Sequence, residues 1–166
     1  LDPGDYPVVF TAAAVSDILG LLAGSLDARS ADEGRSAFSA AGESGTKVGE
    51  KLLDESFQLA SDPIGLGSSP YQGDGLPLER QVWFRDGVLE QLAYDRYWAD
   101  KQGVEPTGFP GSLRMGGGDA TLEELIAGLD RGLFVTRLWY IRRIDPRTIL
   151  YTGLTRDGVF WVENGE

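Results

Sequence analysis

Cysteine and histidine are both absent from this sequence of 166 residues. The chain can therefore form no disulfide, and it carries no thiolate nucleophile, no imidazole base and no ordinary zinc or copper ligand. A metal bound by this chain alone would need a site made of oxygen ligands, of the kind that calcium and magnesium prefer. The composition thus predicts no catalytic, cofactor-binding or metal-ligating residue of the common types.

Long apolar runs and basic residues are also scarce. No apolar stretch approaches the ~20 residues that a membrane-spanning helix needs, so we expect no membrane segment. The chain has 15 Lys and Arg against 26 Asp and Glu, which gives a net charge of −11. This balance disfavours direct nucleic-acid binding, which requires a basic face. One local basic cluster keeps that alternative open: Arg137, Arg142, Arg143 and Arg147.

Glycine is abundant, with 23 residues, which indicates many turns rather than a helical bundle. We expect one domain over residues 1–166, because a chain of this length can bury about two thirds of its unfolded surface. The patterns predict an α+β fold with a mainly antiparallel sheet and three to four helices. The expected helices are residues 12–23 capped by Thr11, 26–40, 94–101, and a helix that starts at a Thr121/Glu124 capping box and ends before Gly132. The expected strands are 6–10, 57–60, 81–84, 88–92, 133–141, 148–153 and 159–162.

Three dipeptides are typical of two-residue hairpin turns: Asp86-Gly87, Asp157-Gly158 and Asn164-Gly165. Together with the start at Leu1-Asp2-Pro3-Gly4, the last turn favours a truncated piece of a larger protein over a complete small protein. In that case a further strand follows Asn164-Gly165.

Several other motifs allow both a structural and a functional interpretation. GLGSSP (65–70) lies in a long loop, 61–77, and could present main-chain amides to a ligand or act as a plain connection. GGGD (116–119) is better explained as the approach to a helix cap than as an anion site. Trp139 and Tyr140, beside arginines, are better explained as half core and half surface than as a nucleic-acid platform. The remaining candidates are Asp74, Asp86, Asp95 and Asp100, and no pattern brings these carboxylates together for acid–base work.

The succession of four segments resembles the TldD/PmbA family, described as modulators of DNA gyrase and as zinc metallopeptidases. These segments are GLGSSP, RDGVLEQLAYDRYWADKQGVEPTG, TLEELIAGLDRGLFVT and GVFWVENGE. The likeness covers nearly the whole chain and places it in the middle-to-C-terminal part of a longer protein. GLFVT and FWVENGE are somewhat more like the PmbA-type (TldE) subunit, which binds no metal. The resemblance departs around YQGDG (71–75), where the family is more acidic, and at LWYIRRIDPRTILYTG (138–153), where it is richer in glycine.

The resemblance implies a cytoplasmic, zinc-dependent peptidase system that acts on unfolded peptides, with two homologous subunits paired as a homo- or heterodimer. No position here matches the family's H-E-x-x-x-H helix or its late cysteine, so zinc is expected in the parent protein or its partner subunit. The chain would then be a scaffold and peptide-binding segment. Its expected peptide contacts are Gly67, Ser68 and Asp74. The alternative is a non-catalytic binding or regulatory subunit, including a protein that modulates gyrase.

Overall fold

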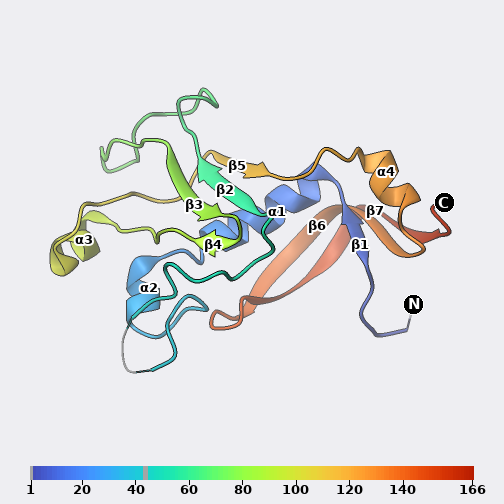
Figure 1. Cartoon of the computed structure of the whole chain (residues 1–166), viewed down its shortest axis with the longest axis horizontal. Helices are drawn as coiled ribbons and strands as arrows, with labels where there is room; N and C mark the ends of the chain where they lie inside the picture. The colour runs from blue at the N-terminus through green and yellow to red at the C-terminus, as the bar shows by residue number, and fades with distance from the viewer. Residues whose placement is uncertain (1, 43–44) are drawn as a thin grey trace. The chain divides into compact units, whose positions relative to one another are not determined.

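A computed structural model describes residues 2–42 and 45–166, and residues 43 and 44 of the loop that follows the predicted second helix lie outside the described residues. Four helices and seven strands occur in the described chain (Figure 1). The helices are α1 (Ala12–Ala23), α2 (Ala28–Asp32), α3 (Arg96–Gln102) and α4 (Leu122–Ala127). The strands are β1 (Val8–Phe10), β2 (Gln58–Ser61), β3 (Gln81–Arg85), β4 (Val88–Leu89), β5 (Leu113–Gly116), β6 (Arg131–Asp145) and β7 (Leu150–Glu163).

The predicted α+β class is confirmed. One sheet has the order β1-β6-β7, and a second has the order β4-β3-β2-β5. Strand β1 pairs with β6 in parallel, and the ladders of the second sheet are all antiparallel. The described chain falls into two compact units. The first contains Leu1–Leu21, Asp119–Ile144 and Tyr151–Glu166; the second contains Leu22–Gly118 and Asp145–Leu150.

In the first unit, Thr11 joins the start of α1 to β6. Its hydroxyl accepts a hydrogen bond from the Ala14 N–H at 3.3 Å and donates one to the Thr136 carbonyl at 2.6 Å. The predicted N-cap is therefore confirmed, and the same side chain also fixes the helix to the sheet. Asp17 of α1 adds an ion pair with Arg137 of β6 at 3.4 Å.

The β6–β7 ribbon, residues 137–144 and 151–160, is largely exposed. Cζ of Arg142 lies 4.1 Å from the ring centre of Tyr140, and Cζ of Arg156 lies 4.2 Å from the ring centre of Trp139, so each guanidinium group stacks on an aromatic ring. Both aromatic rings are about half exposed or more, so the half-core prediction for this pair is wrong. The ribbon's exposed large apolar side chains are Trp139, Tyr140, Ile144, Leu154, Val159 and Phe160.

The core of the second unit lies around Trp83 and Phe84, two consecutive residues of β3 that are each 1% exposed. Leu59 pairs with Phe84 and Ala60 with Val82, so Trp83 is an extra residue in the ladder. In a regular strand, consecutive side chains point to opposite faces. Here the bulge lets both aromatic side chains enter the core. The other fully buried large residues are Leu26, Leu59, Leu89, Leu92 and Pro110.

Local turn and cap signals are confirmed at several places. Asp86 and Gly87 have φ of 51° and 73°, and Asn164 and Gly165 have 53° and 81°, as a type I′ hairpin turn requires. The Thr121/Glu124 capping box is present in full.

The largest differences from the sequence prediction occur at three places. The helix expected over 26–40 is only α2, because Gly34 adopts φ 72° two residues beyond the helix. The helix that starts after Thr121 ends at a Gly128 cap, and Gly132 belongs to β6. The strands expected at 148–153 and 159–162 are one strand, β7, and Asp157 stays inside it with φ 65°. An isolated residue with positive φ can be held within a long ladder, so the Asp157-Gly158 signal was wrong about a turn.

Two glycines test how strongly the second unit depends on close backbone packing. Gly87 and Gly103 have nearly equal φ, 73° and 69°. A Cβ at Gly87 would overlap the main-chain carbonyls of Leu53 and Asp54. A Cβ at Gly103 would meet nothing within 4 Å. We expect Gly103→Ala to cost about 1 kcal/mol for the left-handed backbone alone. Gly87→Ala should cost about 1–3 kcal/mol more, since the backbone must move. Urea unfolding of both variants measures this difference, and equal losses would contradict it.

Candidate functional site

The first half of the long loop folds into a compact turn, residues 62–68. The Asp62 carboxylate accepts a hydrogen bond from the Gly65 N–H at 2.9 Å, and the Asp62 carbonyl accepts one from the Leu66 N–H at 3.0 Å. The Ser68 N–H donates to the Pro63 carbonyl at 2.8 Å, and Gly67 takes φ 66°. The segment GLGSSP is therefore a structured turn closed by its own main chain.

Arg114 of β5 holds this 62–68 turn against the sheet. Its Nε lies 3.1 Å from Oδ2 of Asp62, and one of its terminal nitrogens donates to the Gly65 carbonyl at 3.2 Å. Arginine can bridge two acceptors because its donors form a rigid fork. Arg114 thus links the turn to the edge strand.

The edge of β5 that faces away from β2 pairs with no strand of the described residues. The Asp62 N–H donates to the Ser112 carbonyl at 3.0 Å, so these two residues form a hydrogen-bonded pair that continues the ladder between β2 and β5. Two positions further along this ladder, Ala60 of β2 pairs with Arg114 of β5. Because bonded and non-bonded pairs alternate in an antiparallel ladder, the main chain of Arg114 bonds to β2. The N–H and C=O groups of Leu113 and Met115 then point to the open side.

The second half of the long loop forms a separate turn around Asp74. Its Oδ1 accepts a hydrogen bond from the Leu76 N–H at 3.1 Å, and its Oδ2 lies 3.5 Å from Arg96. Gln72 anchors this turn by accepting from the Phe109 N–H at 2.7 Å. Of the three predicted peptide contacts, Gly67 and Ser68 lie together in one exposed turn, and Asp74 lies in another. Among the described residues, no hydrogen bond or ion pair of Gly67 or Ser68 reaches the turn of Asp74, and the peptide-binding role of all three stays a prediction.

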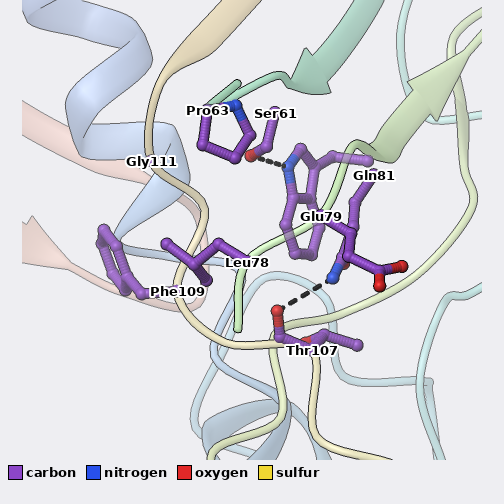
Figure 2. Close-up of a pocket in the computed structure, with 9 residues that line it drawn as sticks. Ser61, Pro63, Leu78, Glu79, Gln81, Thr107, Phe109 and Gly111 are labelled. Atoms are coloured by element: carbon purple, nitrogen blue, oxygen red, sulfur yellow. Dashed lines mark hydrogen bonds between the residues drawn. The ribbon is translucent and has the colours of Figure 1, made fainter. Parts of the chain in front are cut away.

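A small hollow lies between the end of β2, the start of β3 and the segment before β5 (Figure 2). Its volume is about 10 Å³, which is the space for about one ordered water molecule. We call it the Gln81 hollow. The residues that line it are Ser61, Pro63, Leu78, Glu79, Gln81, Trp83, Thr107, Phe109 and Gly111.

Two polar side chains of the Gln81 hollow are fixed by hydrogen bonds. The indole N–H of Trp83 donates to Oγ of Ser61 at 2.7 Å, and Nε2 of Gln81 donates to the Thr107 carbonyl at 2.9 Å (Figure 2). Oε1 of Gln81 is buried and has no hydrogen-bond partner among the described residues. A buried acceptor without a donor costs free energy.

Apolar side chains also reach solvent in this part of the second unit. Ile64 is 72% exposed and Phe109 is 57% exposed, and both flank the loop segments described above. Elsewhere in the second unit, burial first and the charge of Asp32 second raise the pKa of the Tyr94 phenol, so Tyr94 stays neutral at ordinary pH. The other exposed apolar residues of the loop and of β5 are Leu66, Tyr71 and Met115.

Comparison with known proteins decides the family. A model of the family described as "PmbA/TldA metallopeptidase C-terminal domain" matches residues 3–166. This chain belongs to that family. The resemblance read from the four sequence segments is therefore confirmed, and the chain is a PmbA/TldD-type, metallopeptidase-related protein.

Curated and solved relatives agree with this assignment. The metalloprotease PmbA of Escherichia coli O157:H7 is 29% identical over 96% of this chain and 35% of its own length. A crystal structure from Thermotoga maritima, named a "putative modulator of a DNA gyrase", has 26% identity and a TM-score of 0.79, and it covers 100% of this chain and 40% of its own. TldE from Thermococcus kodakarensis, at 24% identity and a TM-score of 0.77, covers 97% and 39% and supports the fold. The chain thus spans about a third of the length of the first curated relative.

Metalloprotease relatives imply a metal in the family, but the residues of this chain do not fit a zinc site. The sequence supplies no histidine or cysteine. In the described part of the chain, no three Asp or Glu side chains gather where they could hold a metal ion. Likewise, no helix among the described residues is both long and apolar enough to cross a membrane.

Sequence analysis missed the residues that organise this site. Gln81 and Ser61 lie in or beside strands, where a polar residue is ordinary, and Arg114 lies in a strand that no pattern predicted. The only signal in the sequence was the long glycine-rich loop, 61–77. It indicated the region of the site but not the residues that contact the loop.

Removal of the Ser61 hydroxyl tests whether the buried Trp83 N–H depends on it. Ser61→Ala should destabilise the chain by about 1–3 kcal/mol, because it leaves that donor buried and unpaired. The matched control is Ser69→Ala, whose exposed hydroxyl bonds to Tyr71 and can be replaced by water. Its loss should be below about 0.5 kcal/mol in urea unfolding. Similar losses for the two variants would show that the Trp83 bond carries no special weight.

Proposed function

We propose that this chain is the scaffold and peptide-binding segment of a PmbA/TldD-type metallopeptidase that acts on unfolded peptides. The observation that carries the proposal is the open edge of β5, with Leu113 and Met115 directing main-chain groups outward. An extended peptide can add to such an edge as a further strand. Main-chain pairing needs no particular sequence, which suits an enzyme that takes unfolded chains.

The surroundings of this edge support the same role. Arg114 keeps the 62–68 turn beside β5, so Gly67 and Ser68 would flank an added strand. Gly67 has no side chain, so a ligand can come close to the main chain there. Its φ of +66° would strain any other residue at this position. Asp74, which is engaged with Leu76 and Arg96, would act by holding the second turn in place. Exposed apolar residues such as Ile64 and Phe109 would cover the peptide's apolar side chains.

Hydrolysis itself is assigned outside this segment. The chain has no residue set that suits zinc, so the metal and its activated water would be held by the rest of the parent protein or by a partner subunit. The residues described here would bind and orient the peptide. In this proposal the parent works in the cytoplasm, as the resemblance implies.

The partner proposed is a homologous subunit, in a homo- or heterodimer. The β6–β7 ribbon supports this because it joins exposed aromatic residues to arginines, a composition typical of protein interfaces. Its charge also fits: the ribbon carries Arg137, Arg142, Arg143 and Arg156, whereas a second copy of this chain has a net charge of −11. The net charge of −11 in turn disfavours nucleic acid or an anionic membrane as the partner.

The alternative is that the parent is a non-catalytic binding or regulatory subunit. Relatives named as "putative" gyrase modulators raise the specific possibility of a gyrase-binding protein. No contact, charge or cavity in the described residues favours gyrase over any other protein. The zinc measurement below separates the two kinds of parent.

Proline in the edge strand tests the binding mode. Met115→Pro removes the N–H that points outward and keeps the ladder to β2, since edge strands accept proline when its nitrogen faces solvent. We expect the parent protein with its partner to bind an unfolded peptide at least tenfold more weakly, with stability within about 1 kcal/mol of wild type. Fluorescence titration of a labelled peptide gives the affinity, and Met115→Ala is the control for the lost side chain. Unchanged affinity in the proline variant would exclude strand addition at β5.

Zinc content tests where the chemistry lies. The isolated chain should bind less than about 0.1 zinc per molecule and cleave no peptide, because it lacks histidine and cysteine ligands. Elemental mass spectrometry of the full-length parent, purified with its partner, should find about one zinc ion per active site. Zinc on the partner alone would support the non-catalytic subunit. Peptide hydrolysis by the isolated chain that survives a chelator would overturn the assignment of the metal to another segment.

A further inference from the structure

A row of apolar side chains runs across the second sheet from the core to β5. Leu59 of β2 pairs with Phe84 of β3 on one side and with Met115 of β5 on the other. Because paired residues of neighbouring strands share a face of the sheet, these three side chains lie in one row. Phe84 and Leu59 are each 1% exposed, whereas Met115 is 47% exposed. The row is therefore buried at one end and open to solvent at β5.

Leu113 extends this apolar surface along β5. It pairs with Ser61, which lies two residues from Leu59 in β2, so Leu113 and Met115 have their side chains on the same face. Leu113 is half-buried. Phe109, which is largely exposed, lines the Gln81 hollow together with Ser61 and adds apolar surface near this face. We call the side chains of Leu113 and Met115 the apolar face of β5.

The opposite face of β5 is polar. Arg114 lies between the two apolar residues and pairs with Ala60, so its side chain points to the other face. There it forms the ion pair with Asp62 and the hydrogen bond to the Gly65 carbonyl. The strand thus presents apolar side chains on one face and a charge-balanced pair on the other.

An extended peptide is the occupant that suits both the main chain and the side chains of this edge. The N–H and C=O groups of Leu113 and Met115 point outward in the plane of the sheet, beside β2 in Figure 1. An added strand pairs with these groups and places every second side chain on the apolar face. Two peptide side chains, two positions apart, would therefore contact Leu113 and Met115. The side chain between them would lie on the face of Arg114.

We propose that β5 selects peptides with apolar side chains at two positions separated by one residue. Leu113 and Met115 contact these two side chains. The residue between them can be polar or charged, because it faces the Arg114–Asp62 pair. Met115 is the main specificity-determining residue, since its side chain is the more exposed of the two. This inference rests on the proposed function, and it adds a spacing rule to recognition that otherwise uses the main chain.

Two peptides of identical composition test the spacing. Both are blocked hexapeptides of serine and threonine with two leucines, which occupy positions 3 and 5 in one peptide and positions 3 and 4 in the other. Adjacent leucines point to opposite faces of a strand, so only one of them can cover the apolar face. In fluorescence titrations of the full-length parent with its partner, we expect the 3,5 peptide to bind about 3- to 5-fold more tightly, as for one further cross-strand apolar pair.

Variants of Met115 assign this difference to the apolar face. Met115→Ser removes the apolar side chain and keeps the main chain, so it should reduce the difference to less than about twofold. Met115→Leu should retain it. The matched control is Val104→Ser, because Val104 is 46% exposed in the same unit but lies outside the strands. This control should keep the full difference.

The outcomes separate the side-chain preference from strand addition itself. Equal binding of the two peptides to the wild-type protein, or an undiminished difference in Met115→Ser, overturns the preference and leaves the proposed function standing. If neither peptide binds, the proposed peptide-binding function fails and the preference fails with it. A crystal structure of the wild-type complex with the 3,5 peptide should place a leucine side chain against Met115. Leucines on the face of Arg114 would overturn the preference.

Discussion

The hydrogen bond between the Trp83 indole N–H and the Ser61 hydroxyl is the constraint on which the second unit depends. A side chain as large as tryptophan adds much apolar contact to a core, but its N–H must find a partner once water is excluded. Ser61, 5% exposed and at the end of β2, is that partner at 2.7 Å. The bond fixes where the indole lies, and the bulge in β3 then lets Phe84 enter the same core.

The site follows from this arrangement. Because β3 carries an extra residue, the ladder between β2 and β3 changes register just before Gln81 and Ser61 meet. Those two residues, with Trp83, supply the polar wall of the Gln81 hollow. On the other side of β2, Arg114 holds the 62–68 turn beside β5. Strand β2 therefore has the buried polar residues of the Gln81 hollow on one side. On its other side lie β5, with its open edge, and the 62–68 turn.

Open edges and exposed aromatic surfaces are hazards in a free protein, because they pair with other chains without selectivity. This family member has both: the β5 edge of one unit pairs with no further strand in the described chain, and the other unit carries the β6–β7 ribbon. It spans about a third of the length of its first curated relative. Surfaces of this kind support the proposal that this segment binds peptide and a partner subunit. The acidic charge of the rest of the chain and the arginines of the ribbon fit that proposal.

Sequence alone determined the features that depend on neighbours within about four residues. The Thr11 cap, the Thr121/Glu124 capping box and the two turns at Asp86-Gly87 and Asn164-Gly165 all formed as expected, because their hydrogen bonds and φ angles are set locally. The α+β class also followed, since periodicity and turn spacing reflect which faces are buried. The missing histidine and cysteine excluded an ordinary zinc site, and the order of four motifs indicated the family.

Tertiary structure decided the rest. It shortened the helix expected over 26–40, merged two predicted strands into β7, and made an edge strand of residues 113–116, which no local pattern marked. It also placed Trp83 beside Ser61, 22 residues away, and Arg114 beside Asp62, 52 residues away. A ladder register, a buried acceptor without a donor and an unpaired edge are properties of chain segments brought together from afar. Their energies depend on those partners, and for that reason the sequence pointed to the loop but not to the site.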